Sequence, residues 1–276
     1  MSTPAVAQVS VVIPCFLCER TLSDALASVA RQTIRPAEVI LVDDGSPLET
    51  RQAIRALASL HGDWITILPL PRNCGAGAAR NAGWAVATQP YVAFLDADDT
   101  WHPQKIEIQH GFMDRHPDVA LCGHRIAVSR REGALTFPVT SDDYAVSDIS
   151  RHSLLVRNAF STPTVMVKRD LPFRFNEVRR HAEDLALWQQ IAFARMRVAR
   201  LELTLAHVHK PLYGATGLSA QLWKMEAAEL SNLFALYRRR DIAVVVLLGS
   251  ASLSIIKFAL RLVRVLTRRL MAATRS

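Results

Sequence analysis

The sequence has few cysteines, and they lack the spacing of a disulfide framework. Among 276 residues there are four, Cys15, Cys18, Cys74 and Cys122. Sparse, irregular cysteines are typical of a reducing compartment. Cys15 and Cys18 have the spacing of a redox pair, but two buried thiols are the better interpretation. The N-terminal MSTPAVAQVS lacks a basic region followed by an apolar run, so we expect no secretory signal.

Excess charge is missing from most of the chain. Residues 1–236 contain 24 basic and 24 acidic residues, whereas residues 237–276 contain nine basic residues and one acid. The formal net charge of +8 therefore comes from the C-terminal segment alone. An enzyme that acts on nucleic acid usually carries basic charge on its working domain, so we expect no nucleic-acid partner.

Apolar segments alternate with helical patterns in the first half of the chain. Strands are predicted at residues 9–13, 38–42, 64–68 and 91–95, and helices at 19–32, 49–60, 75–88 and 103–115. Continuous apolar strands between helices indicate a mainly parallel sheet covered on both faces, which is a doubly wound α/β fold. After about residue 118 the alternation loosens. Further strands are predicted at 119–129, 162–168 and 198–208, and a helix at 181–196.

Polar sequences follow each of the first four predicted strands. They are PCFLCE at 14–19, DDGS at 43–46, PRNCGAGAARNAG at 71–83 and DADD at 96–99. Ligands of such sheets bind outside the carboxyl ends of the strands, so these segments should lie together. Carboxylates, a glycine-rich turn and the arginines Arg72 and Arg80 suit a nucleotide with a diphosphate and a metal ion.

Asp96 and Asp98 have the alternate spacing that presents two carboxylates to one hard cation, Mg²⁺ or Mn²⁺. The alternatives are a solvated loop, or Asp99 as the cap of the helix that starts near His102. The run from Gly75 to Arg80 nearly matches a dinucleotide fingerprint, but an arginine replaces its third glycine. At a helix start Arg80 suits a phosphate, and a tight turn is an equally good interpretation.

Two further pairs are candidates. Glu183 and Asp184 stand at a predicted helix start, where acids are also favoured by the helix dipole alone. His207 and His209 alternate on a strand-like segment, as ligands or as surface residues.

Seven motifs in order resemble family 2 glycosyltransferases of the GT-A fold. They are VSVVIPCF, ASVARQT, EVILVDDGS, RNCGAGAARNAG, YVAFLDADD, STPTVMVKRD and AEDLALW, between residue 9 and about residue 219. The resemblance implies a metal-assisted transfer from a nucleotide sugar with inversion at the anomeric carbon. It also implies a glycosyltransferase domain at 1–236, with a nucleotide-binding half at about 8–117 and an acceptor half at about 118–220.

The resemblance also suggests roles for single residues. Pro14, Phe16 and Asp44 would hold the base and ribose. Arg80 and Asp96 would border the diphosphate and sugar. Asp98 would be the main protein ligand of Mn²⁺ or Mg²⁺, and Asp184 would be the catalytic base, with Glu183 as the next candidate. The residue types fit this chemistry, because a metal neutralises the leaving diphosphate while a carboxylate deprotonates the acceptor hydroxyl.

The C-terminal segment, 237–276, predicts a helix. Its uncharged run, Ile242 to Ile256, is shorter than a bilayer-spanning segment, and a basic stripe follows at Lys257, Arg261, Arg264 and Arg268. We expect this helix to hold the enzyme at the cytoplasmic face of the membrane. The alternatives are a tilted span, a helix packed on the catalytic domain and a dimer contact. A chain truncated after Tyr237 is expected to be soluble and to hydrolyse donor.

The expected substrates are a nucleotide-diphosphate sugar and a glycan or lipid-linked acceptor used in surface polysaccharide synthesis. Two other functions stay open from the sequence. One is a non-catalytic nucleotide-sugar binder, and the other is a nucleotidyltransferase with a metal-carboxylate rim. The oligomeric state also stays open.

Overall fold

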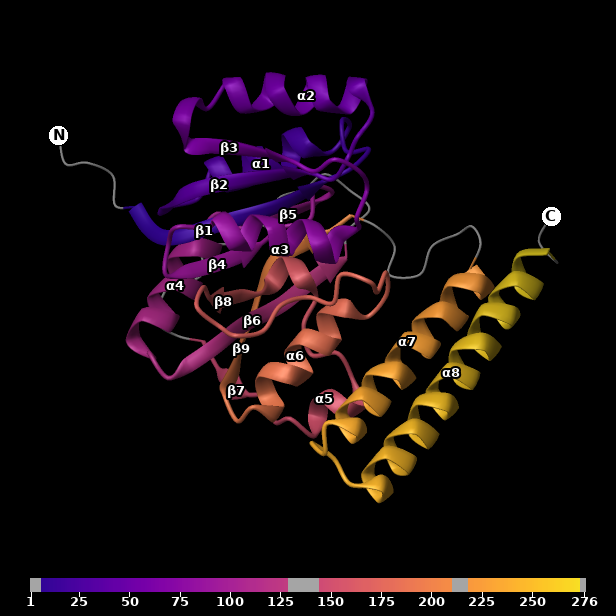
Figure 1. Ribbon diagram of the computed structural model, residues 1–276. Coiled ribbons are helices and arrows are strands. Elements are labelled where there is room, and N and C mark those ends of the chain that lie inside the picture. Colours follow the sequence, from indigo (N-terminus) through magenta and orange to yellow (C-terminus); the bar gives the residue numbers. More distant parts are fainter. Residues whose placement is uncertain (1–5, 129–143, 210–217, 274–276) are drawn as a thin grey trace.

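One mixed sheet organises the chain, with helices on both of its faces (Figure 1). The computed structural model describes residues 6–128, 144–209 and 218–273. For residues 218–221 and 264–273 it describes the backbone alone. The strands are β1 Val6–Cys15, β2 Arg35–Asp43, β3 Ile65–Pro69, β4 Tyr91–Phe94, β5 Asp99–Trp101, β6 Val119–Val128, β7 Val146–Asp148, β8 Met166–Lys168 and β9 Arg197–Val208.

The helices alternate with these strands in the first half of the chain. They are α1 Leu22–Ala30, α2 Leu48–Ser59, α3 Ala76–Val86, α4 Lys105–Arg115, α5 Ser153–Val156, α6 Glu183–Phe193, α7 Leu218–Arg238 and α8 Val244–Ala273. Two 3₁₀ turns, Gly62–Trp64 and Thr162–Thr164, complete the described elements. The elements expected in the first 117 residues are therefore present, and their ends differ from the expected ones by a few residues.

The sheet has the strand order β3-β2-β1-β4-β8-β6-β9-β5, and β7 pairs with β9 beside this path. The strands from β3 to β4 are all parallel, as the sequence predicts. Beyond β4 the sheet is mixed, because β8 runs antiparallel to both β4 and β6, whereas β6 and β9 are parallel. The α/β fold expected from the sequence is confirmed, and its continuous parallel part is formed by β1 to β4.

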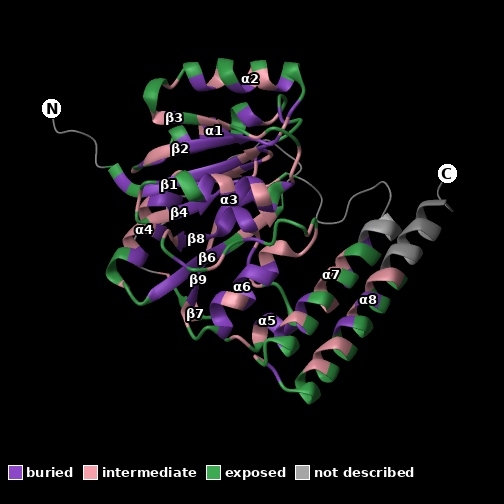
Figure 2. Ribbon diagram, in the orientation of Figure 1, coloured by how far each residue is buried: buried purple, intermediate pink, exposed green. Residues whose placement is uncertain are grey.

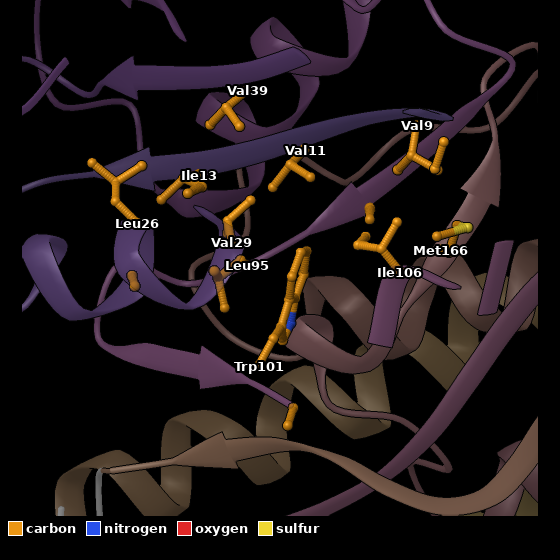
Figure 3. Packing of buried hydrophobic residues seen from close by; sticks show 14 of the residues in the cluster. Val9, Val11, Ile13, Leu26, Val29, Val39, Leu95, Trp101, Ile106 and Met166 are labelled. Atoms are coloured by element: carbon orange, nitrogen blue, oxygen red, sulfur yellow. The ribbon is translucent and has the colours of Figure 1, made fainter. Parts of the chain in front are cut away.

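Two apolar layers hold the helices against the sheet. On one face, alternate residues of β1 such as Val11 and Ile13 pack with Leu26 and Val29 of α1 and with Ile106 of α4 (Figure 3). On the other face, α3 and α6 pack against side chains that point the opposite way along the same strands. Strands that are buried on both faces read as continuous apolar runs, which explains why their sequences predicted them clearly.

Gly83 brings α3 close to the sheet. A Cβ atom at this position would lie 2.5 Å from a methyl group of Val12 and 2.9 Å from one of Val42. Only glycine therefore lets α3 approach β1 and β2 this closely. The N-terminus of α3 is consequently held near the carboxyl ends of those strands.

The helices α7 and α8 form an antiparallel pair that extends from the lower part of the body (Figure 1). Their inner ends share a small core with α5 and α6, made by Leu155, Phe193, Leu233, Leu236 and Ile242. The outer surface of α8 is largely exposed (Figure 2). Val244–Val263 is long and apolar enough to cross a membrane by length and composition, and only 17% of its most apolar window is buried.

Candidate functional site

The carboxyl ends of β1, β2 and β4 open into a cleft of about 480 Å³, called the donor cleft below. Its lining includes five of the residues expected to bind the nucleotide sugar and the expected metal ligand. The lining residues are Pro14, Cys15, Phe16, Leu17, Cys18, Thr21, Asp44, Asn73, Gly75, Ala76, Arg80, Asp96, Ala97, Asp98 and Arg180. The structure thus brings together segments that are far apart in the sequence.

Asp44 fixes the loop that precedes α3. Its Oδ1 accepts a hydrogen bond from the backbone N–H of Cys74 at 2.7 Å, and its Oδ2 accepts one from the N–H of Gly75 at 2.8 Å. Gly75 has a φ of +93°, which favours glycine. A Cβ at Gly75 would also lie 2.6 Å from the guanidinium of Arg180. The buried carboxylate of Asp44 therefore sets the shape of one wall of the donor cleft.

Arg80 points at carboxylates. Its Nη2 lies 2.6 Å from Oδ1 of Asp96, and its Nη1 lies 3.2 Å from Oε1 of Glu183. Burial alone would lower the pKa of Arg80, but the charges of Asp96 and Glu183 outweigh it and raise that pKa. The arginine that the sequence assigned to the diphosphate thus also neutralises one carboxylate of the DADD segment.

The remaining carboxylates of that segment have different surroundings. Asp98 lines the donor cleft and is partly exposed, whereas Asp99 is buried and begins β5, which pairs with β9. Within the described residues no three His, Cys, Asp or Glu side chains gather to hold a metal ion. Asp96 and Asp98 nevertheless fit a hard cation that takes further oxygens from a diphosphate, since Mg²⁺ is commonly held by one or two carboxylates and substrate phosphates.

Asp184 lies in the first turn of α6, outside the lining of the donor cleft. Its Oδ2 accepts a hydrogen bond from Nδ2 of Asn158 at 2.9 Å, and its Oδ1 accepts one from the N–H of Leu185 at 2.7 Å. Burial and the neighbouring charge of Glu183 raise the pKa of Asp184 to about 6, against the two hydrogen bonds and Arg80, which favour the charged form. A carboxylate with this pKa is ionised at neutral pH and is a stronger base than an ordinary one.

One continuous polar path joins these two regions. It runs from Asp96 through Arg80 to Glu183, and Asp184 is the next residue on α6. The path starts beside a cleft that is suited to a diphosphate and ends beside a candidate base. Such an arrangement separates leaving-group chemistry from proton abstraction, which an inverting displacement requires.

The sequence model of glycosyl transferase family 2 matches residues 10–181. The chain belongs to glycosyl transferase family 2.

Several glycosyltransferases are similar in sequence to this chain over part of their length. The amylovoran biosynthesis glycosyltransferase AmsE of Erwinia amylovora is 29% identical over 187 residues, covering 65% of this chain and 67% of that protein. The UDP-Glc:alpha-D-GlcNAc-diphosphoundecaprenol beta-1,3-glucosyltransferase WfgD of Escherichia coli is 29% identical over 185 residues, covering 66% and 69%. An uncharacterized glycosyltransferase of Nostoc sp. is 43% identical over 100 residues, which are 36% of this chain and only 31% of that relative.

Solved structures of other transferases share the fold. The mannosyltransferase PcManGT from Pyrobaculum calidifontis, in complex with GDP-Man and Mn²⁺, superimposes with a TM-score of 0.66 at 17% identity, covering 99% of this chain and 81% of that one. Residues 1–349 of S. aureus TarS, in complex with UDP-GlcNAc, give a TM-score of 0.60 at 18% identity and cover 82% of this chain and 66% of that one. These similarities establish the GT-A fold of the chain.

Sequence reasoning missed two polar residues at the site of this family 2 chain. Arg180 lines the donor cleft and donates a hydrogen bond to Oδ1 of Asn73 at 2.8 Å. Asn158 holds Asp184 from the loop after α5. Arg180 belongs to the arginine pair before the acids of α6, which was a weak signal. Asn158 has no sequence pattern around it, and only the fold brings it to Asp184.

The two candidate histidines lie near β5. Nε2 of His209 is 3.0 Å from Oγ1 of Thr100, and His207 is paired with Thr100 in the sheet register. Burial, and then the charges of His209 and His102, lower the pKa of His207. The structure places both histidines beside the strand that follows Asp98. Residues 210–217, which follow His209, lie outside the described residues.

Proposed function

We propose that the chain is a metal-dependent inverting glycosyltransferase that moves a sugar from a nucleoside-diphosphate sugar to a hydroxyl group of a lipid-linked glycan acceptor. One observation carries this proposal. The ion pairs of Arg80 with Asp96 and Glu183 connect the donor cleft to Asp184, whose pKa is raised. The name of the Escherichia coli relative, a diphosphoundecaprenol-directed transferase, supports the choice of a lipid-linked acceptor.

The proposed displacement has a simple balance. The Asp184 carboxylate takes the proton of the acceptor hydroxyl, and the acceptor oxygen forms a bond to the anomeric carbon. The bond from that carbon to the phosphate oxygen breaks, and the nucleoside diphosphate leaves with the electron pair. Asn158 orients Asp184 through the 2.9 Å hydrogen bond. Direct displacement from the face opposite the leaving group inverts the anomeric carbon.

Donor binding involves the residues of the donor cleft. Phe16 is 42% exposed at the mouth of the cleft, where an aromatic ring suits a nucleobase, and Pro14 and Asp44 lie beside it. Asp98, with Asp96 next to it, would hold Mn²⁺ or Mg²⁺, which would neutralise charge on the leaving diphosphate. The Mn²⁺ in the complex of PcManGT supports the use of a divalent metal ion.

We also propose that α8 attaches the enzyme to the cytoplasmic face of the membrane. Many apolar residues of this helix are exposed, and they are Val244, Val245, Val246, Leu248, Leu253, Ile255, Ile256, Leu260 and Val263. The basic stripe expected to meet lipid headgroups is only partly available, because Lys257 donates a hydrogen bond to the carbonyl of Val156 and Arg261 approaches Glu226 at 3.5 Å. Attachment through α8 would therefore depend mainly on its apolar residues.

A panel of nucleotide sugars tests the enzymatic proposal. With Mn²⁺ present, the true donor should raise the melting temperature of the protein and should be hydrolysed slowly to the free sugar and nucleoside diphosphate. Binding without any hydrolysis or transfer would favour a non-catalytic binder. Release of inorganic pyrophosphate would instead identify a nucleotidyltransferase, and either result would contradict the proposal.

A further inference from the structure

A second cleft, of about 420 Å³, lies between the end of α5 and the helices α7 and α8. We call it the α5–α8 cleft. Its lining residues are Val156, Arg157, Asn158, Met225, Glu229, Lys257, Leu260 and Arg261. It is nearly as large as the donor cleft and shares none of its lining residues, so the two clefts are separate.

The lining of the α5–α8 cleft is predominantly cationic. Three basic side chains face one acid, Glu229. Arg261 is partly neutralised, because it lies 3.5 Å from Glu226 and 3.8 Å from Glu229. Among the described residues, neither Arg157 nor Lys257 lies within ion-pair distance of a carboxylate. Lys257 donates a hydrogen bond to the carbonyl of Val156, and its charge, like that of Arg261, favours the charged form of Glu229. The cleft therefore keeps an excess of positive charge, with Arg157 as the cation that has no charged partner among the described residues, and this suits an anion with several oxygens.

Asn158 connects the α5–α8 cleft to the proposed base. Its side chain lines the cleft, and its Nδ2 donates the hydrogen bond to Oδ2 of Asp184. An anion bound beside Arg157 would thus be separated from Asp184, the proposed base, by the side chain of Asn158. This position suits the charged part of the acceptor.

Apolar side chains continue from the cleft onto the surface of α8. Leu260 lines the cleft and is 55% exposed, and Ile256 and Val263 are exposed on the same helix. Val156 adds an exposed apolar side chain at the opposite rim. An anion in the cleft would therefore have an apolar surface beside it on which a hydrocarbon chain can lie.

We propose that the α5–α8 cleft binds the diphosphate that joins the acceptor sugar to its lipid, chiefly through Arg157 and Lys257. The inference rests on the proposed lipid-linked acceptor and deepens it. The diphosphate in the cleft would present the sugar to Asp184, and the lipid would continue along Leu260 and the exposed residues of α8. Recognition of the linkage would select lipid-linked acceptors over free sugars before any sugar-specific contact is made.

Isothermal titration of the full-length protein in a nonionic detergent with geranyl diphosphate, a short prenyl diphosphate, tests the proposal. The titration is done with EDTA, because a metal ion would help the probe to enter the donor cleft. Arg157→Gln and Lys257→Gln should each weaken binding by about tenfold, the usual scale for losing one charge-assisted hydrogen bond. Lys257→Arg, which keeps the positive charge, should restore most of the affinity.

Two matched substitutions serve as controls. Lys224→Gln removes an exposed cation from α7 outside the cleft, and Arg180→Gln removes one from the donor cleft. Neither should change the affinity for geranyl diphosphate. If Arg180→Gln weakens binding and Arg157→Gln does not, the probe occupies the donor cleft and the proposal is wrong. Arg157 is exposed, and among the described residues its side chain has no polar partner, so its substitution should not unfold the protein.

Inorganic pyrophosphate and anionic vesicles separate the possible sources of the anion. Geranyl diphosphate should bind more tightly than pyrophosphate, because the apolar rim contributes. Equal affinity for the two would overturn the lipid part of the proposal. If Arg157→Gln and Lys257→Gln reduce binding to phosphatidylglycerol vesicles but leave geranyl diphosphate binding intact, the cations contact membrane headgroups and the proposal is wrong.

The titration is independent of transfer activity. Probe binding that depends on Arg157 and Lys257 would support the anion site even if no nucleotide sugar were hydrolysed. Donor hydrolysis together with probe binding that is insensitive to both substitutions would reject the site and leave the proposed function standing. The two proposals therefore fail in distinguishable ways.

Discussion

Asp184→Asn should make the enzyme nearly inactive. It should also change the pH dependence of stability: the free energy of unfolding of the variant, compared with that of the wild type, should be more favourable at high pH than at low pH. The pKa of Asp184 is raised from its ordinary value of 3.8 to about 6, chiefly by burial and then by Glu183. The folded state therefore favours the protonated carboxyl. Asp184 costs the wild type stability as the pH rises from about 4 through 6, whereas an asparagine does not titrate.

The size of the effect follows from the two pKa values. One pKa unit corresponds to about 1.4 kcal/mol, so the full cost at pH 8 approaches about 3 kcal/mol. Roughly a third of that cost is already present at pH 4.5, which leaves about 2 kcal/mol between pH 4.5 and pH 8. Asp184 keeps some contact with solvent, so we expect about 1–2 kcal/mol. A lost hydrogen bond to Asn158 affects the variant similarly at both pH values and cancels from this difference.

Urea unfolding of both proteins at pH 4.5 and pH 8 measures this difference. Turnover of Asp184→Asn should fall by roughly 10²–10⁴-fold, the usual scale for losing a general base, with donor affinity nearly unchanged. The wild-type rate should rise with pH through about 6, and Asn158→Ala should move that rise to higher pH, because the hydrogen bond from Asn158 lowers the pKa of Asp184. The assignment of Asp184 as the base would be wrong if the stability difference between variant and wild type were the same at both pH values and the turnover of the variant were within a few-fold of wild type. Asp184 would then act only as a helix cap.

Two other variants test the proposed metal ligand and the membrane helix. Asp98→Asn should keep the fold and abolish metal-dependent donor binding, because it replaces an anionic ligand with a neutral one; unchanged affinity in a titration with Mn²⁺ would reject the assignment. The full chain should sediment with anionic liposomes, and salt should weaken this association only partly. The double substitution Ile255→Glu with Ile256→Glu should abolish the association, because both side chains are exposed on α8. A protein that stays in the supernatant without detergent or lipid would show that α8 is a packing helix.

The sequence predicted the nucleotide-binding half of the fold well because its strands are buried on both faces. β4 reads as an uninterrupted apolar run and β1 as a mainly apolar one, broken by Gln8 and Ser10, and the polar residues at their carboxyl ends lie together in the structure as expected. The antiparallel placement of β8 between β4 and β6 was not predicted, since a strand of three residues carries little periodicity. Its position is determined by long-range pairing rather than by local sequence.

The C-terminal region shows the same limit. The helix expected in 237–276 is present as α8, but its pairing with α7 and its contacts with α5 were not predicted. Lys257 and Arg261 belonged to a stripe that the helical period places on one face. The period cannot tell whether that face meets lipid or protein. In the structure, Lys257 and Arg261 face α5 and α7, which is how the α5–α8 cleft acquires its charge.

Glu183 and Asp184 show why the candidate site needed the structure. The two acids are adjacent at the start of α6, and a helix N-terminus favours both equally. Glu183 is held by Arg80 at 3.2 Å, so its charge is compensated, and its negative field raises the pKa of its neighbour. Asp184 forms no ion pair in the described residues; the hydrogen bonds from Asn158 and Leu185 and the more distant charge of Arg80 do not outweigh its burial and the charge of Glu183. Two carboxylates whose environments differ in this way take different roles, and the uncompensated one is suited to accept a proton. The assignment of the base therefore depends on Arg80, a residue more than a hundred positions away in the sequence.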